Sequence, residues 1–413
     1  MLLKNASIWY YEQIIQGHIL VNEQSGLIEK ISQSLSEIGS SNEIIDLKGK
    51  LVIPSLVDIH SHLRDFEESH KETYETGALA AASGGFTTIF DMPNKLHPVD
   101  CSERLNKAVE KTQQIDKVKI VPFALLTKNT EEALINDYPY FKAYLGITTG
   151  EYLTNLTDIN DLLNRGAGVL TVHCEDNLRI IANLKLYQDT LENHIKIRDP
   201  QTEFLAIKNL LEKTKDVVSK VKLHIAHVTL IESINLLHSR HISFEVTPHH
   251  LLLNYNDFSQ LGVRGKVNPP LRSKTEQKKL LDSFLRGEIH IIGTDHAPHT
   301  IQEKEDFELA GIPGLETCLP LLLNQCKPLD KRKLRLIINA LAVNPRYLMN
   351  LPEKGVIAVD EPANLTVIDP KKKRKVRGDD LKTKCKWSPW EGVELQGWPV
   401  LTINKGKITY NDL

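Results

Sequence analysis

Short apolar runs alternate with longer amphipathic stretches through most of the chain. The first clear run, LVIPSLVDIH, spans residues 51–60, and the amphipathic stretch KETYETGALAAASG follows it before the next run begins at residue 86. Apolar runs of this length indicate strands, and the stretches between them have helical spacing. The eight predicted strands cover residues 51–60, 86–92, 118–126, 140–145, 168–173, 222–228, 242–247 and 290–293.

Eight strands that alternate with helices over roughly 250 residues have the size and rhythm of a (β/α)8 barrel. A doubly wound open sheet would give a similar alternation. The first strand is not followed by the Gly-x-Gly-x-x-Gly turn of a dinucleotide-binding sheet, so the barrel is favoured. We therefore expect an α/β fold with a TIM-type barrel over residues 51–354.

Both ends of the chain have a different pattern, with short strands separated by turns. Residues 1–50 contain several such strands, and the pattern returns after residue 355 in GVIAVDEPANLTVID and WPVLTINKGKITY. A few short strands do not make a stable unit alone. We expect residues 1–50 and 355–413 to form one small discontinuous β-sandwich domain beside the barrel.

The composition is that of a globular protein without a strongly charged partner. Of the 413 residues, 41% are hydrophobic and 25% are charged, and 51 Lys and Arg nearly balance 53 Asp and Glu, for a formal net charge of -2. This balance gives no electrostatic reason to expect nucleic acid or a membrane surface as a partner. We expect a homo-oligomer, in its simplest form a homodimer.

The five cysteines are odd in number and include no Cys-x-x-Cys pair, which favours thiols in a reducing compartment. The first residues lack the long apolar stretch of a secretory signal, and no later stretch is apolar for long enough to cross a bilayer. We expect a cytoplasmic protein. The run PKKKRKV at residues 370–376 has the composition of a nuclear localisation signal, but it follows a predicted strand, and we interpret it as a solvated loop.

Residues of the kind that bind metal ions stand at the ends of the predicted strands. His60 and His62 are one residue apart, so both side chains point to one face of the first strand while Ser61 points to the other. Arg64 continues on the histidine face if the chain stays extended. Two converging imidazoles suit zinc or a similar divalent ion. Taken alone, the pair is equally compatible with ordinary histidines at a strand end.

Further residues of this kind end other strands. His173, His227 and Asp295 close the fifth, sixth and eighth strands, and in a barrel the carboxyl ends of all strands meet at one face. Each histidine taken singly is more simply explained as a hydrogen-bonded core residue, which is our interpretation of His224. An ionised Asp295 needs an ion partner or a metal, because burying an unpaired charge is costly.

Lys142 lies within the predicted strand 140–145, between Phe141 and Tyr144. An ammonium beside divalent cations is disfavoured, and burial also favours the neutral amine. A neutral lysine can add carbon dioxide to give a carbamate, a carboxylate-like group that can bridge two metals. The alternative is a surface lysine whose stem covers apolar surface, which the flanking aromatic residues disfavour.

Eight segments carry these residues: DIHSHLRD, DMPN, FKAYLGITT, HCEDN, AHV, VNPPLR, GTDHAPH and GIPGLET. Together they resemble dihydroorotases of the amidohydrolase superfamily, in the form that uses a carboxylated lysine. The resemblance runs from about residue 51 to residue 346. His-x-His-Leu-Arg, Met-Pro-Asn and Asn-Pro-Pro-Leu-Arg in combination separate dihydroorotases from hydantoinases and allantoinases, which share only the metal ligands.

The resemblance implies two zinc ions per subunit. The implied ligands are His60, His62, Lys142, His173, His227 and Asp295. The first two histidines would bind one ion and the last two the other, N6-carboxylysine at Lys142 would bridge them, and Asp295 would complete the first ion and act as the acid/base. The implied reaction is the reversible zinc-dependent cyclisation of N-carbamoyl-L-aspartate to (S)-dihydroorotate and water, the third step of de novo pyrimidine biosynthesis.

The resemblance also implies the residues that contact this small-molecule substrate. The carboxylate would be bound by Arg64, Asn94 and His299, with His62 contacting the substrate as well. The pyrimidine ring would be contacted by Asn268 and the backbone around Ala310 and Gly311. A mobile catalytic loop that closes over the substrate would include Thr148 and Thr149.

Two alternatives to a dihydroorotase stay open on the sequence. A hydantoinase or allantoinase would share the metal ligands, and Arg64 with Asn94 discriminates against it. A catalytically inactive relative that serves as a scaffold for a carbamoyltransferase should have lost ligands, whereas all six positions are filled. Kinetics of an Arg64 variant and the metal content of the purified protein separate these possibilities.

Overall fold

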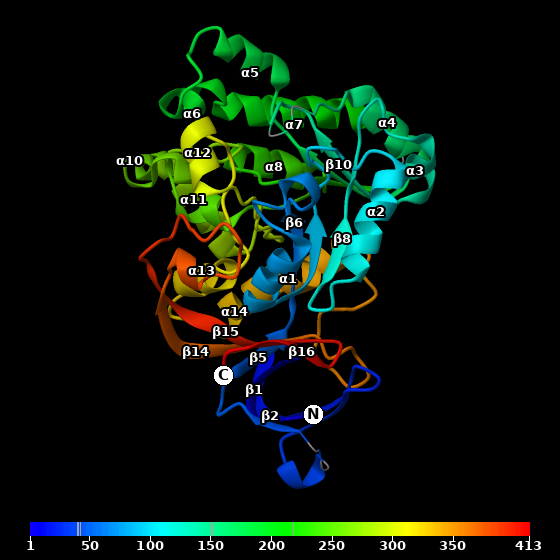
Figure 1. Ribbon diagram of the computed structural model, residues 1–413, viewed down its shortest axis with the longest axis vertical. Coiled ribbons are helices and arrows are strands. Elements are labelled where there is room, and N and C mark those ends of the chain that lie inside the picture. The colour runs from blue at the N-terminus through cyan, green and yellow to red at the C-terminus, as the bar shows by residue number, and fades with distance from the viewer. Residues whose placement is uncertain (39–40, 42, 149, 151, 218) are drawn as a thin grey trace.

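The computed structural model describes residues 1–38, 41, 43–148, 150, 152–217 and 219–413. Figure 1 shows helices around central strands in the upper part of the molecule and a strand-rich layer at the lower end, where both chain termini lie. This is the α/β architecture that the sequence predicts. Thr149, in the predicted catalytic loop, lies outside the described residues.

The two ends of the chain form one sheet. Its strands are β1 (Leu2–Tyr10), β2 (Gln13–Asn22), β3 (Leu27–Ser32), β4 (Ile44–Asp46), β5 (Leu51–Pro54), β14 (Leu365–Lys375), β15 (Glu394–Asn404) and β16 (Lys407–Asn411). The order is β16-β15-β14-β5-β1-β2-β3, with β4 paired to β1. Because β5 pairs parallel with β1 and antiparallel with β14, the C-terminal strands extend the sheet that the N-terminal strands begin. The predicted joining of the termini is confirmed.

A small apolar core belongs to this sheet. Ile8, Ile19, Val52, Val367 and Leu401, from five different strands, are fully or almost fully buried and pack together. Burial of apolar surface is the main favourable term in holding such a layer together. The division of the chain into two domains, residues 1–50 with 355–413 and residues 51–354, stays a proposal. Strand β5 falls in the second range but pairs within the terminal sheet.

The barrel strands follow one another in chain order. They are β6 (Leu56–Ser61), β7 (Phe86–Asp91), β8 (Lys119–Pro122), β9 (Ala124–Leu125), β10 (Tyr140–Tyr144), β11 (Ala167–His173), β12 (Lys220–Ile225) and β13 (Ser243–Phe244). They pair in parallel as β6-β7-β8 and β9-β10-β11-β12-β13. Single bridges from Val246 to Ile292 and from His296 to Ser61 place the segment after residue 290 between β13 and β6.

Three predicted strands differ from the structure. The predicted strand over 51–60 is two strands, because the chain leaves the terminal sheet after Pro54 and enters the barrel at Leu56. The predicted strand over 118–126 is interrupted at Phe123, and the predicted strand over 290–293 makes only the bridge at Ile292. Periodicity along the sequence cannot reveal such breaks, because they depend on which neighbouring strand is available for pairing.

The helices connect and cover the strands. Their bounds are α1 (Tyr74–Ser83), α2 (Ser102–Gln113), α3 (Glu132–Asp137), α4 (Leu156–Arg165), α5 (Asn177–Leu184), α6 (His194–Ile197), α7 (Pro200–Thr214), α8 (Ile231–Ser239), α9 (Pro248–Leu252), α10 (Phe258–Leu261), α11 (Lys274–Arg286), α12 (Ile301–Phe307), α13 (Cys318–Gln325), α14 (Lys331–Ile338) and α15 (Asn344–Leu348). Capping boxes at Thr73, Ser273 and Thr300 begin three of them. Within the part of the chain that is described, no helix has the length and apolar character needed to span a membrane.

Aromatic side chains fill the barrel interior. The ring centroids of Phe90 and Phe123 are 5.7 Å apart, and Tyr140 packs edge-on against Phe90 at 5.1 Å. Val57 and Ile59 on β6 join the same cluster. These residues make a solid floor, so polar side chains at the strand ends lie above packed apolar rings rather than above a water channel.

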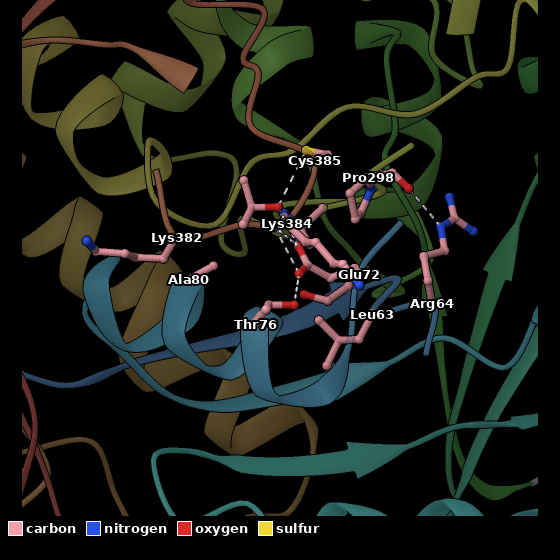
Figure 2. Close-up of polar contacts among 12 residues, drawn as sticks. Leu63, Arg64, Glu72, Thr76, Ala80, Pro298, Lys382, Lys384 and Cys385 are labelled. Atoms are coloured by element: carbon pink, nitrogen blue, oxygen red, sulfur yellow. Dashed lines mark hydrogen bonds and ion pairs between the residues drawn. The ribbon is translucent and has the colours of Figure 1, made fainter. Parts of the chain in front are cut away.

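The connection between β14 and β15 lies against the barrel. The Glu316 carboxylate accepts hydrogen bonds from the backbone N–H groups of Lys382 and Thr383, at 2.8 and 3.0 Å. The Glu72 carboxylate accepts from the N–H of Lys384 at 3.1 Å and from the hydroxyls of Thr76 and Thr383. Figure 2 shows the Glu72 carboxylate between helix α1 and this connection. Two buried carboxylates thus hold the segment in place.

The basic run at 370–376 is a correction to the sequence interpretation. It is not a loop, because Lys373, Arg374 and Lys375 pair with β15 within strand β14. Lys372 forms an ion pair with Asp412 at 2.9 Å, and the Arg374 guanidinium lies 4.8 Å from the Trp398 ring. Charged side chains on the exposed positions of a strand protect it from further pairing, which gives this run a structural explanation.

Candidate active site

A cleft opens at the carboxyl ends of the barrel strands. It is lined by His60, His62, Arg64, Asn94, Lys142, Tyr144, Thr148, His173, His227, Asn268, Asp295, Ala297, Ala310 and Gly311. The structure therefore brings together in this lining every described residue of the predicted site except His299. His299 is not part of the lining but contacts Arg64, which is. Two lining residues, Tyr144 and Ala297, were missed by the sequence analysis.

The predicted metal ligands converge in this cleft. Asp295 Oδ1 lies 3.4 Å from His60 Nε2 and 3.2 Å from His62 Nε2. Donor atoms of His60, His227 and Asp295 all lie within 4.8 Å of one another. His173 Nδ1 is 2.9 Å from His227 Nε2, which brings the fourth histidine to the same point. The residues come from β6, β11 and the ends of later strands, as the strand-end argument predicts.

Lys142 extends from β10 into the middle of this group. The side chain is fully buried, and its Nζ has no hydrogen-bond partner among the described residues. Burial lowers the pKa of Lys142 to about 8, although Glu245 and Asp295 act in the opposite direction. The Nζ atom lies 5.2 Å from the centre of the Tyr144 ring. A surface lysine is thereby excluded.

Two buried carboxylates orient the histidines, and the sequence analysis missed both. Glu245 contacts His60 Nδ1, and Glu175 Oε2 lies 2.9 Å from His173 Nε2. Burial acts against ionisation of Glu175, but the Arg198 guanidinium and His173 lower its pKa to about 2. Such outer carboxylates fix the tautomer and the direction of a metal-binding imidazole. Glu175 could have been predicted to contact His173, because it follows that histidine by two residues. Nothing in the sequence near His60 points to Glu245.

The residue before Asp295 is anchored to strand β6 by hydrogen bonds. Asp58 accepts hydrogen bonds from the Thr294 N–H at 2.8 Å and from the Thr294 hydroxyl at 2.6 Å, and it also accepts from Ser61. Burial raises the pKa of Asp295, although His60 and Lys142 act in the opposite direction. A carboxyl group whose pKa lies above the ordinary range, placed inside a cleft, is suited to exchange protons with a substrate.

A cationic wall lies beside the metal ligands. The Arg64 guanidinium lies 3.0 Å from His299 Nε2. The Arg64 Nε donates to the Pro298 carbonyl at 3.1 Å (Figure 2). Asn94 Oδ1 lies 2.8 Å from His62 Nδ1. Arginine presents a planar fork that matches a carboxylate in two hydrogen bonds. This wall is therefore suited to an anionic substrate group.

The remaining predicted residues complete the lining of the cleft. Asn268 Nδ2 donates to the Thr148 hydroxyl at 3.3 Å, and His299 Nε2 lies 3.2 Å from the Ala310 carbonyl. Gly311 has a φ of +135°, and a Cβ there would come within 2.6 Å of the Ala297 carbonyl. Only glycine allows the backbone to pass so close at this point.

The donor set fits divalent metal ions. It combines imidazole nitrogens with a carboxylate, which are ordinary ligands of zinc and related ions. The unpartnered Nζ of Lys142 and Nδ1 of His227 are buried polar atoms with no hydrogen-bond partner among the described residues. Buried polar atoms without a partner are costly, and a bound cation together with a carboxylated lysine would satisfy them.

Comparison with known proteins identifies the family of the chain. Residues 51–409 match the model of the amidohydrolase family. The chain is 34% identical to the dihydroorotase of Methanosphaera stadtmanae, over 94% of this chain and 92% of that protein, and 31% identical to the dihydroorotase of Staphylococcus epidermidis, over 100% and 99%. The L-hydantoinase of Arthrobacter aurescens has the same fold, with a TM-score of 0.92 and 24% identity over 100% of this chain and 96% of that one. The chain therefore belongs to the amidohydrolase family, and within that family to the dihydroorotases.

Proposed function

We propose that this enzyme interconverts N-carbamoyl-L-aspartate and (S)-dihydroorotate in pyrimidine biosynthesis, with two zinc ions and a carboxylated Lys142. The observation that carries the proposal is the meeting of four histidines, Asp295 and a buried lysine in one cleft, directly beside the Arg64 and His299 pair. The relatives named dihydroorotase over nearly the whole chain support the same substrate.

The proposed metal ligands divide between two ions. His60, His62 and Asp295 would hold one ion, His173 and His227 the other, and the carbamate of Lys142 would bridge them. When bound, such ions lower the pKa of a water molecule and polarise a carbonyl group. The burial of Lys142, which favours its neutral amine, supports carbamate formation because only the neutral amine adds carbon dioxide.

Asp295 is the proposed proton carrier. In ring opening its carboxylate accepts the proton of the attacking water and delivers it to the ring nitrogen that leaves, so that a C–O bond forms and a C–N bond breaks. Ring closure takes up one proton from solvent on the carboxylate of carbamoyl-aspartate. The ureido nitrogen then loses its proton to Asp295 and forms the C–N bond, and Asp295 passes that proton to the departing oxygen, so that the C–O bond breaks and water is released. The burial that raises the pKa of Asp295 supports this exchange, because the group can then hold the proton between the two transfers.

Arg64, Asn94 and His299 are the proposed binding residues for the carboxylate outside the ring. Arg64→Ala is expected to raise the KM for dihydroorotate by about 100-fold, because a charge-assisted two-point contact is lost. Arg104→Ala, which removes an arginine outside the cleft that pairs with Asp100, is the control and should keep KM within about threefold. An unchanged KM in the Arg64 variant would favour a hydantoinase or allantoinase instead.

A direct assay of ring closure on carbamoyl-aspartate tests the proposal as a whole. The purified protein is expected to be active, to lose at least about 90% of the activity on removal of metal by a chelator, and to recover on addition of zinc, because the proposed metal ligands converge on one point of the cleft. Less than one zinc per chain in freshly purified, inactive protein would instead support the scaffold alternative.

We further propose that the enzyme is a cytoplasmic homodimer without a nucleic-acid or membrane partner. The nearly balanced charge, with a formal net charge of -2, supports the expectation of no nucleic-acid or membrane partner. The absence of Cys-x-x-Cys pairs from the sequence supports a reducing compartment. Sedimentation at micromolar protein concentration measures the assembly directly.

A further inference from the structure

Lys304 is a second fully buried lysine, on helix α12 at the edge of the active-site cleft. Its ammonium donates hydrogen bonds to the carbonyls of Leu309 at 2.8 Å, Gly311 at 2.7 Å and Lys266 at 3.3 Å. All three N–H donors of the lysine are therefore used on backbone carbonyls. None of the proposed catalytic steps explains this arrangement.

Lys304 forms no ion pair with a carboxylate of the described residues. No carboxylate of the described residues lies within 4.0 Å of its Nζ, and the face of the Trp387 ring is 5.5 Å away. Burial lowers the pKa of Lys304 to about 7, and Lys266 and Arg64 add to this effect. A buried ammonium is costly unless its donors are satisfied, so the carbonyl contacts determine whether this lysine is tolerated.

The carbonyls that bind Lys304 belong to the cleft wall. Residues 309–311, which we call the wall loop, include Ala310 and Gly311 of the cleft lining. The Gly311 N–H donates to the Lys266 carbonyl at 2.9 Å, and the Ala310 carbonyl faces His299 Nε2 at 3.2 Å. The ammonium thus joins the wall loop to residue 266 on one side, while His299 joins it to Arg64 on the other.

The segment after β14 fixes the other side of this arrangement. Trp387 packs over Lys304, and its indole Nε1 donates to the His299 carbonyl at 2.8 Å. The same segment is held to the barrel by the Glu72 carboxylate, which accepts a hydrogen bond from the Lys384 N–H at 3.1 Å (Figure 2). Lys304 Nζ therefore lies between the Trp387 ring and the carbonyls of the wall loop.

We propose that Lys304 is a positioning residue that sets the wall loop against the Arg64 and His299 pair and thereby determines the affinity for the substrate ring. This inference rests on the proposed function, because the wall loop is assigned there to the ring. The lysine acts through the backbone of Ala310 and Gly311 and has no part in the proton transfers.

Lys304→Met tests the inference, because methionine keeps the unbranched stem under Trp387 and removes only the ammonium. KM for carbamoyl-aspartate and dihydroorotate is expected to rise at least about tenfold while kcat changes less than about threefold. Hydrogen exchange of the peptide spanning residues 305–315 is expected to accelerate, because the loop has lost its anchor. This second readout does not depend on activity.

Lys222→Met is the matched control. It removes an ammonium that also donates to backbone carbonyls, those of Tyr347 at 2.7 Å and Leu348 at 3.1 Å, away from the cleft. KM in this variant should stay within about threefold of the unaltered enzyme. Equal effects in the two variants, or a loss of kcat at constant KM in Lys304→Met, would overturn the inference.

A second variant covers the case in which Lys304→Met does not fold. Gly311→Ala keeps Lys304 and displaces the wall loop directly, since the new Cβ would meet the Ala297 carbonyl at 2.6 Å. KM is expected to rise at least about tenfold here too, and an unchanged KM would overturn the inference. An unaltered enzyme without ring-closing activity would instead reject the proposed function, while the exchange measurement would still test the anchor.

Discussion

Lys142→Ala is expected to lower kcat for ring closure by about 1000-fold, on the order of 4 kcal/mol in the barrier, and to reduce bound zinc below one equivalent per chain. The side chain is buried among all the other proposed ligands, so its carbamate would be the bridging group. The measurement is the initial rate of dihydroorotate formation together with metal analysis of the same sample.

Lys222→Ala is the control for this variant. Lys222 also lies on a barrel strand, but its Nζ donates to the Tyr347 carbonyl, away from the cleft. We expect activity within about threefold of the unaltered enzyme and full metal content. Partial recovery of Lys142→Ala on addition of a short carboxylic acid would support a carbamate role, whereas a fully active, fully metallated Lys142→Ala would reject it.

Asp295→Asn is expected to lower kcat in both directions by about 1000-fold with a smaller effect on KM, because the amide fills the same space but cannot accept a proton. In the unaltered enzyme, ring opening should slow as the pH falls and Asp295 becomes protonated. The residual activity of the variant should not show this acidic limb. The measurement is a pair of kcat profiles from pH 5 to pH 8.

Asp199→Asn provides the comparison. Asp199 caps helix α7 and pairs with Arg179 outside the cleft, so the variant should keep the acidic limb and most of kcat. An Asp295→Asn enzyme that retained both the acidic limb and more than about a tenth of kcat would assign the proton transfer to another group.

Much of the active site could be predicted from the sequence because its information is local. His60 and His62 share a face by strand alternation, and the barrel gathers strand ends wherever they occur in the chain. Lys142 was predicted to be unusual from its position on a strand that ends beside the predicted metal ligands, and its aromatic neighbours disfavoured a surface lysine. The same kind of local pattern indicated that both termini form strands, and mutual pairing was the simplest way for them to bury their apolar faces.

Other features depend on partners that are distant in the chain. Glu245 contacts His60 across 185 positions, and Glu72 holds Thr383 across 311. The chain breaks between β5 and β6 because β5 pairs with β14 in the terminal sheet. The basic run lies in a strand because β14 pairs with β15. Hydrophobic periodicity carries no information about such pairings.

The sequence by itself therefore determined the kinds of elements and the residues that end them, because backbone geometry repeats every two or 3.6 residues. Only the tertiary structure decided which buried charges support one another. That choice depends on the full three-dimensional surroundings of each charge, since the cost of burying it is offset only by groups that the fold brings within hydrogen-bond distance. Lys304 is an example, because its sequence context is that of an ordinary surface helix. Its burial results from contacts with Trp387 and the wall loop, which are distant or irregular parts of the chain.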